Sequence, residues 1–258
     1  MSRAPRIAML IGAGESSRII FNAIDRAHGV VGVVREQAPS RRVLTQRRLK
    51  RVGAVQVGGQ LAFQLVAAPI LARRARSRIA TIIAENGLDL SEIPPDRVVD
   101  VESANTPEAI EALRRLEPDV VLLNGTRIIG KRMLEGVGKP FVNTHAGITP
   151  GYRGVHGGYW ALAQQRPELC GVTVHLVDTG IDTGGVLAQA IIRPGPEDCF
   201  PTYRFLQLAA AIPLLVQALP EIGRGNVKPV PPLDPASRLW YHPTIWQYMS
   251  TWWLLGVH

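Results

Sequence analysis

The chain has 258 residues, of which 46% are hydrophobic and 19% are charged, and its formal net charge is +8 at pH 7. This composition provides ample apolar material for a core and excludes a disordered chain. No unbroken apolar run reaches the roughly 18 residues of a membrane span. The two cysteines are too few for a disulfide framework or a closed metal site. We therefore expect a globular protein of the reducing cytoplasm.

The first half of the chain alternates between apolar runs and helical patterns. The runs that predict strands are residues 6–11, 30–34, 82–85, 98–101, 119–123 and 140–143. The patterns that predict helices are residues 19–27, 107–116 and 131–135, with Thr106 as an N-cap and Pro107 in the first helical turn. This alternation predicts an α/β, Rossmann-like fold with a mostly parallel sheet and helices on both faces.

The second half begins with two further predicted strands, residues 171–177 and 185–192, which are joined by a DTGIDTG loop. A helix is expected over residues 203–219, and a tail rich in Pro and Trp follows it with a short terminal helix. We expect residues 196–258 to form a C-terminal helix and a short extension that pack on the body formed by residues 1–195.

One region looks inserted, at about residues 38–80, and we expect it to be helical with a kink or break at Pro69. Between Arg35 and Arg78 there are eleven basic residues and a single acid, Glu36. Such a basic segment either meets phosphates, anionic lipid or nucleic acid, or forms a solvated helical face.

A glycine-rich turn, GAGESS at residues 12–17, follows the first predicted strand. Such a turn before a helix directs backbone N–H groups and the positive end of the helix dipole toward an anion. A dinucleotide fingerprint would need a third glycine where Ser17 stands and an acid near the end of the second strand. Glu36 supplies an acid, but the insert follows it directly. The turn therefore either contacts a substrate, through Gly14 and Ser16, or is only a tight turn.

A second pattern, VNTHAGITPGYRG at residues 142–154, places polar side chains at the end of an apolar strand. Residues two apart on a strand face the same way, so Asn143 and His145 project together. Open parallel sheets bind ligands at this carboxyl edge. A lone histidine there is often structural, but the nearby Asn and the Gly/Pro loop favour chemistry.

A third pattern is VDTGIDTGG at residues 177–185, where two Asp-Thr-Gly units form a loop between strands. Asp182 is placed to reach the same edge as His145. The alternative is a turn held by Asx hydrogen bonds, which suits Asp178 as well as Asp182. Aspartic proteases also carry Asp-Thr-Gly, but their β-rich lobes do not fit this α/β rhythm. The spacing of the His, Cys and Asp residues predicts no metal site.

Together these patterns resemble the folate-dependent formyltransferases, a family that acts on glycinamide ribonucleotide, methionyl-tRNA or sugar nucleotides. The resemblance rests on the Asn-x-His strand end, the ITPGYRG loop and the Asp-Thr-Gly after GVTVHLVD, and it covers about residues 80–195. It implies that Asn143, His145 and Asp182 are catalytic and that 10-formyltetrahydrofolate is the co-substrate, without a metal. The residues implied to bind that cofactor are Asn124, Gly125, Arg127, Ile128, Ile129, Asp178 and Gly180.

The implied reaction explains these residue types. When a substrate amine attacks the formyl carbon, the carbonyl oxygen becomes negative. An amide N–H from Asn143 and an imidazolium N–H from His145 would both donate to that oxygen, and fixed donors of this kind are worth roughly 3–4 kcal/mol each. Asp182 would favour the charged imidazolium and would accept the proton of the amine.

The implied acceptor is an amino sugar linked to a nucleotide, and the chain most resembles enzymes of the GDP-perosamine N-formyltransferase type, which serve O-antigen and lipopolysaccharide synthesis. This choice rests on HGGYWAL at residues 156–162 and on a segment after Ile192 that is short for the barrel domain of methionyl-tRNA enzymes. The residues implied to contact the substrate are Gly14, Ser16, Arg153, His156, Tyr159 and Trp160. Tyr159 and Trp160 serve equally well as helix core.

Several alternatives remain open at this point. One is a glycinamide ribonucleotide formyltransferase, and another is a catalytically silent nucleotide-binding protein with the same fold. A nicotinamide-dependent oxidoreductase is supported by the glycine turn alone. We expect no nucleic-acid partner, a monomer or homodimer, and peripheral membrane contact through the basic segment.

Overall fold

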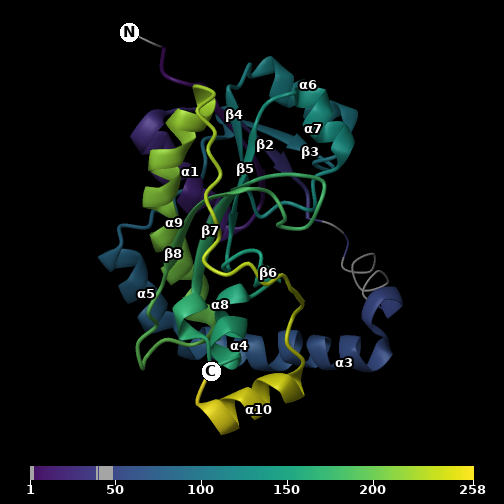
Figure 1. Ribbon diagram of the computed structural model, residues 1–258, viewed down its shortest axis with the longest axis vertical. Coiled ribbons are helices and arrows are strands. Elements are labelled where there is room, and N and C mark those ends of the chain that lie inside the picture. The colour runs from purple at the N-terminus through teal and green to yellow at the C-terminus, as the bar shows by residue number, and fades with distance from the viewer. Residues whose placement is uncertain (1–2, 39, 41–48) are drawn as a thin grey trace.

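The computed structural model describes residues 3–38, 40 and 49–258, and its centre is a seven-stranded sheet (Figure 1). The order of the strands is β3-β2-β1-β4-β5-β7-β8. Their bounds are β1 Ile7–Gly12, β2 Val30–Glu36, β3 Val98–Val101, β4 Val120–Asn124, β5 Phe141–His145, β7 Gly171–Leu176 and β8 Val186–Ile191. The first five pair in parallel, and β7 and β8 are antiparallel. The predicted α/β fold with a mostly parallel sheet is confirmed.

Helices cover both faces of this sheet. Their bounds are α1 Glu15–His28 and α9 Phe200–Gly223 on one face, and α6 Pro107–Arg115 and α7 Lys131–Val137 on the other. Successive residues of β1 point to opposite faces. Met9 accordingly lies in the core cluster that includes α9 residues, and Leu10 lies in the cluster with α6 and α7 residues.

The helix α6 begins where the sequence predicts. The Thr106 side chain accepts a hydrogen bond from the Ala109 backbone N–H, and Pro107 occupies the first turn. The predicted strand at residues 82–85 is wrong, because these residues form the last turn of helix α5 (Arg76–Glu85). Ile82 is buried there against Ile19 and Phe205, so its apolar neighbours mark a helical face and not a strand.

The inserted region is mainly helical over its described part, and residues 39 and 41–48 of the predicted insert lie outside the described residues. It contains α3 (Ala54–Ala62), a π-helical turn η1 (Phe63–Ala67) and α4 (Ala68–Arg74), followed by α5. The chain stays helical through Pro69, and its helix type changes directly before this residue, from the π-helical turn η1 to α4.

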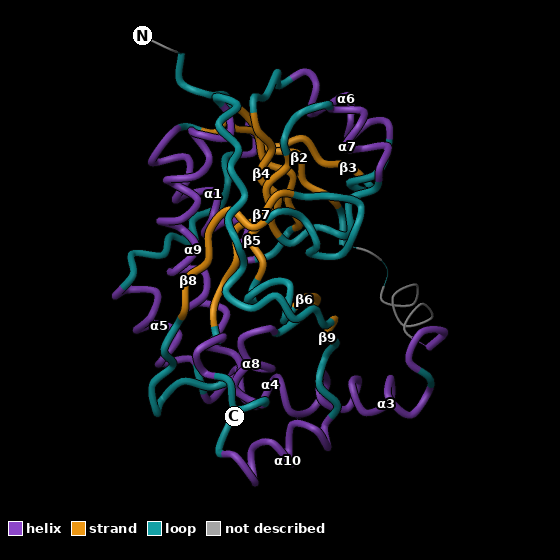
Figure 2. Tube along the Cα trace, viewed as in Figure 1, coloured by secondary structure: helices purple, strands orange, loops and turns teal. Residues whose placement is uncertain are grey.

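The chain after α9 runs as a loop along the sheet and ends in helix α10 (Ile245–Leu255) (Figure 2). On its way, strand β9 (Leu239–Trp240) pairs in parallel with β6 (Arg153–Gly154). Helix α8 (Gly157–Ala163) lies nearby, and two 3₁₀ turns, Pro95–Arg97 and Pro167–Leu169, complete the elements.

Helix α10 contacts α3 across a glycine. A Cβ added at Gly59 would lie 2.2 Å from the Trp246 ring, so a side chain there would force this ring to move. Phe63, Tyr159, Tyr203 and other aromatic side chains fill a third core cluster beside this contact.

Candidate active site

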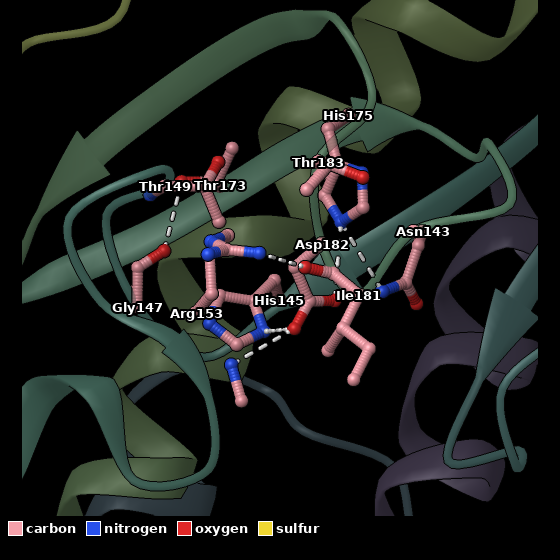
Figure 3. A network of polar contacts seen from close by, with 12 residues as sticks. Asn143, His145, Gly147, Thr149, Arg153, Thr173, His175, Ile181, Asp182 and Thr183 are labelled. Atoms are coloured by element: carbon pink, nitrogen blue, oxygen red, sulfur yellow. Dashed lines mark hydrogen bonds and ion pairs between the residues drawn. The ribbon is translucent and has the colours of Figure 1, made fainter. Parts of the chain in front are cut away.

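Three polar side chains from two distant segments meet at the carboxyl end of β5. Asn143 and His145 come from β5 itself, and Asp182 comes from the loop between β7 and β8. The Asp182 carboxylate lies 3.3 Å from His145 Nδ1 and 3.5 Å from Asn143 Nδ2. Figure 3 shows the carboxylate between the two side chains. The residues that the sequence singled out for chemistry therefore do converge.

Asp182 is held in place by several donors. The Gly154 backbone N–H donates to its Oδ2 at 3.0 Å, and Arg153 fixes the adjacent loop by donating to the Ile181 carbonyl at 3.1 Å. Burial alone would raise the pKa of this carboxyl. The His175 hydrogen bond, the nearby His145 ring and the Gly154 N–H outweigh burial and bring the pKa to about 2. Asp182 is consequently ionised at all ordinary pH values.

His145 is buried with an acceptor beside each ring nitrogen. Its Nε2 donates to the Tyr152 carbonyl at 2.6 Å, and its Nδ1 faces Asp182. Burial lowers the pKa of His145, and Asp182 and the Tyr152 carbonyl raise it by less. Desolvation thus opposes the charged imidazolium that the sequence predicts, whereas the two oxygen atoms beside the ring nitrogens favour it.

Gly147 is required by this arrangement. A Cβ at that position would lie 2.5 Å from the Tyr152 carbonyl oxygen and 2.9 Å from His145 Nε2. The loop after β5 therefore folds back on the histidine ring and fixes its tautomer. The tightness of the ITPGYRG loop thus serves to hold the His145 ring.

Two further residues of this site were missed by the sequence reasoning. His175 on β7 donates from Nδ1 to the Leu176 carbonyl at 2.6 Å, and its Nε2 lies 3.3 Å from Asn143 Nδ2 and 3.6 Å from Asp182. Among the described residues, the buried Thr144 hydroxyl has no hydrogen-bond partner. In the antiparallel pairing of β5 with β7, His175 stands directly opposite Asn143. A polar residue in the apolar run of residues 171–177 was the sequence signal for His175.

These residues lie between two cavities. A cleft of about 750 Å³ is lined by Asn143, His175 and Asp182, and a smaller pocket of about 290 Å³ is lined by the N-terminal turn of α1. Thr144 and His145 line both cavities. A site with two chambers and shared polar residues suits a reaction between two substrates.

The predicted cofactor loop at residues 124–130 borders the cleft in part. Gly125, Arg127, Ile128, Asp178 and Gly180 line it. Asn124 instead lines the smaller pocket. Ile129 is buried in the core cluster under α6 and α7, which corrects its assignment: this side chain anchors the loop and does not face the cleft.

A buried ion pair holds that loop. Glu36 accepts hydrogen bonds from the backbone N–H and from Nε of Arg127, both at 2.6 Å, and from the Ala104 N–H at 2.9 Å. Its carboxylate is thus engaged by the protein and is not presented to a ribose. Glu36, the acid that a dinucleotide fingerprint would require, instead holds the loop at residues 124–130.

The glycine turn forms a wall of the smaller pocket through Gly14 and Ser16. Ser17, which stands where a dinucleotide fingerprint has glycine, donates from its hydroxyl to the Asn124 carbonyl at 3.2 Å. A Cβ at Gly12 would lie 2.3 Å from the carbonyl oxygen of Gly125. The turn is therefore built to contact the loop after β4.

The remaining predicted substrate residues are placed differently. Tyr159 and Trp160 are buried in the aromatic core cluster, which corrects their assignment and fits the helix-core alternative. Helix α8 turns both side chains inward. His156 lies 2.9 Å from His242, which lines the cleft, and Arg153 holds the Asp182 loop. Tyr159, Trp160, His156 and Arg153 are therefore absent from the described lining of both the cleft and the smaller pocket.

The family model for formyl transferase matches residues 65–205, which is more than half of the chain. The chain belongs to the formyl transferase family. The matched part contains β5, the following loop and Asp182, whereas the glycine turn lies before it.

Curated relatives of this chain include methionyl-tRNA formyltransferases. Methionyl-tRNA formyltransferase from Synechococcus sp. (strain JA-3-3Ab) is 34% identical over 145 residues, which are 54% of this chain and 42% of that protein. The chain thus spans less than half the length of this relative.

Two solved structures share the fold. A sugar N-formyltransferase from Shewanella sp. FDAARGOS_354 superposes with a TM-score of 0.55 at 10% identity, over 91% of this chain and 76% of that chain. Phosphoribosylglycinamide formyltransferase from Anaplasma phagocytophilum gives 0.57 at 16% identity, over 92% and 97%. At these identities the likeness concerns the fold alone.

Proposed function

We propose that the protein transfers a formyl group from 10-formyltetrahydrofolate to the amine of a nucleotide-linked amino sugar. The observation that carries the proposal is that Asn143 and Asp182 line the cleft beside His145, which borders both the cleft and the smaller pocket. In this arrangement a donor in one chamber and an acceptor in the other meet at the polar residues.

The cleft suits the formyl donor. Its volume falls within the range of about 300–1,000 Å³ that is usual for ligand sites. Its lining combines apolar residues, such as Ile128 and Trp240, with polar residues that include Asp182. This size and mixed lining, together with the tetrahydrofolic acid bound by a structural neighbour, HypX from Aquifex aeolicus, support 10-formyltetrahydrofolate as the co-substrate.

The residues divide the chemistry in a way that revises the sequence-based roles. Asn143 donates its amide N–H toward the oxygen that becomes negative, and such a donor is worth roughly 3 kcal/mol. Asp182, with a pKa of about 2, is a poor proton acceptor near neutral pH. The proton of the attacking amine passes to Nδ1 of His145, the ring nitrogen beside the Asp182 carboxylate, and that carboxylate stabilises the imidazolium while Nε2 keeps its hydrogen bond to the Tyr152 carbonyl.

The acceptor class is supported by the smaller pocket. The first turn of α1 presents backbone N–H groups, and Arg204 borders the same space and pairs with Glu15 at 2.8 Å. These groups fit the phosphates of a nucleotide. The sugar N-formyltransferase of the same fold is consistent with this class, and the proposed type remains GDP-perosamine, an O-antigen sugar.

A second candidate acceptor is methionyl-tRNA. The 34% identity to a methionyl-tRNA formyltransferase favours it, as does the basic segment between Arg35 and Arg78. Glycinamide ribonucleotide is a third acceptor of the same reaction class. The three candidate acceptors would receive the formyl group from the same donor. They differ in the size and charge of the molecule that the smaller pocket and its surroundings would have to bind.

The test is a panel of acceptors incubated with 10-formyltetrahydrofolate and analysed by mass spectrometry. The panel contains GDP-, dTDP- and UDP-linked amino sugars, glycinamide ribonucleotide and methionyl-tRNA, with the His145→Ala protein as control. Formylation of a nucleotide sugar by the wild type alone supports the proposal. Reaction with only one of the other acceptors refutes the sugar assignment, and equal results for the two proteins refute the catalytic role of His145.

A further inference from the structure

Helix α10 and the inserted helices leave an unusual amount of apolar surface exposed. On α10, Trp253 is 87% exposed, and on α3, Val55 is 79% exposed. The exposed apolar side chains of these elements are Val55, Leu65, Val66, Ile70, Trp246, Met249, Trp252, Trp253, Leu254 and Leu255. We call the surface formed by α3, η1, α4 and α10 the α3–α10 face; these elements lie together at one end of the molecule (Figure 1).

The two segments that build this face lack acids altogether. The chain has no Asp or Glu between Gln37 and Ala84, and none after Asp234. Basic residues are frequent in the first segment, and the last turn of α4 ends in Arg73 and Arg74, both exposed. The face therefore combines bulky apolar groups with positive charge only.

The apolar character of this face is not that of an ordinary core helix. Two helical stretches among the described residues have the length and composition of a membrane span, Ala54–Arg74 and Phe200–Gly223. The second is α9, which contributes Leu215 and Leu219 to the main core. The first is the more exposed of the two, although Phe63 anchors it in the aromatic cluster. It is held against the body as a surface element.

We propose that the α3–α10 face docks on the surface of an anionic lipid bilayer. Tryptophan is favoured at the boundary between lipid tails and headgroups, where Trp246, Trp252 and Trp253 would lie. Arginine beside it is attracted to acidic headgroups. A second copy of this chain fits less well, because a two-fold contact would place two acid-free basic faces against each other.

The docking would also orient the cleft. Arg51 lies 5.3 Å from the centroid of the Tyr241 ring, and both residues line the cleft. The chain continues from His242 directly into α10. One wall of the cleft is thus continuous with the face, so the bound protein holds the cleft close to the bilayer. This inference is independent of which acceptor the enzyme uses.

The test is flotation of the full chain with vesicles of phosphatidylcholine alone or mixed with phosphatidylglycerol. We expect binding to the anionic vesicles that weakens as salt rises. Arg73→Gln/Arg74→Gln should lower the partition coefficient about 20- to 30-fold, because each basic residue at an anionic surface is worth about fivefold. The matched control is Arg114→Gln/Arg115→Gln, an exposed pair in the last turn of α6, which lies outside the α3–α10 face. This control should change the partition coefficient by less than about twofold.

The apolar part is tested in the same assay. Trp253→Ser/Leu254→Ser should lower binding at least about tenfold, since burial of each side chain is worth about 1.5–3 kcal/mol. The control is Val99→Ser/Leu233→Ser, which removes exposed apolar groups from the edge strand β3 and from the segment beside β8. Equal losses for the two double variants would overturn the proposal.

A measurement on the wild type avoids any folding defect of the variants. Bromine-labelled lipid quenches tryptophan fluorescence only over short distances. Three of the five tryptophans lie on α10, whereas Trp160 and Trp240 are buried. Quenching by brominated anionic vesicles supports docking. Absence of quenching, a dimer that Trp253→Ser/Leu254→Ser dissociates, or binding of RNA but not of vesicles would each overturn it.

Discussion

Two carboxylates lie at the same edge of the sheet and differ in what surrounds them. Glu36, at the end of β2, accepts three hydrogen bonds from Arg127 and Ala104 and is 3% exposed. Asp182, beyond the end of β7, faces two histidines and an asparagine and lines the cleft. An arginine fixes the first as a permanent ion pair, whereas titratable and polar neighbours leave the second available to a substrate. The neighbours, more than the burial, separate a structural carboxylate from a chemical one.

The largest expected difference between the two regions is in catalysis. Asp182→Asn removes the charge that stabilises the imidazolium of His145 and should lower kcat/KM for formyl transfer about 10²- to 10⁴-fold. The melting temperature should be compared with that of the wild type to show that the variant is folded. A loss of less than about tenfold would place Asp182 outside the reaction.

The counterpart is Glu36→Gln, whose main effect should be on stability. It leaves the guanidinium of Arg127 without its charge partner and should lower the free energy of unfolding by about 3 kcal/mol, measured in urea. In the double variant Glu36→Gln/Arg127→Gln, part of this loss should be recovered. If Glu36→Gln abolished formyl transfer and left stability unchanged, the contrast with Asp182 would be void.

Acid sharpens the comparison further. The pKa of Asp182 is about 2 in the folded protein and 3.8 in its ordinary state, so its ionised form stabilises the fold. The contribution, about 2 kcal/mol, is present in full above pH 3.8 and is lost as pH falls toward 2. The stability gap between wild type and Asp182→Asn should therefore narrow on acidification. A constant gap from pH 6 to pH 2 would contradict the assigned pKa.

The smallest effect is expected one residue before Glu36. Arg35 pairs with Asp100 through two hydrogen bonds of 2.7 and 2.8 Å, but both side chains are substantially exposed. Arg35→Gln should cost less than about 1 kcal/mol. Because it removes a neighbouring ion pair on the same edge, it is the matched control for Glu36→Gln in urea unfolding. A cost as large as that of Glu36→Gln would show that burial does not distinguish the pairs.

Much of the fold was predictable because buried parallel strands are nearly continuous apolar runs, as in residues 6–11 and 119–123. The strand predicted at 82–85 failed because a short β-branched run fits a helical face equally well, and here Ile82 packs inward from α5. Whether such a run forms a strand or a helix depends on the residues that pack against it in the folded protein.

The site was predictable where spacing carries geometry. Asn143 and His145 lie two residues apart on one strand, so the sequence predicts that they point the same way. The position of Asp182 depends on the conformation of a loop, which no periodicity in the sequence predicts. The roles were harder to predict than the positions. The lowered pKa of His145 follows from burial, and the core placement of Ile129, Tyr159 and Trp160 follows from how α7 and α8 pack. Neither can be read from residue types alone.

The close approach of Gly12 to the Gly125 carbonyl has a consequence for ligand binding. Gly14 and Ser16, next along the glycine turn, border the smaller chamber, and Gly125 borders both chambers, so they share one backbone partition. A ligand that shifts this partition alters the affinity of the other chamber, and linkage makes the influence mutual. Donor and acceptor would then report on each other's presence, and a side chain introduced at position 12 would disturb both binding constants at once.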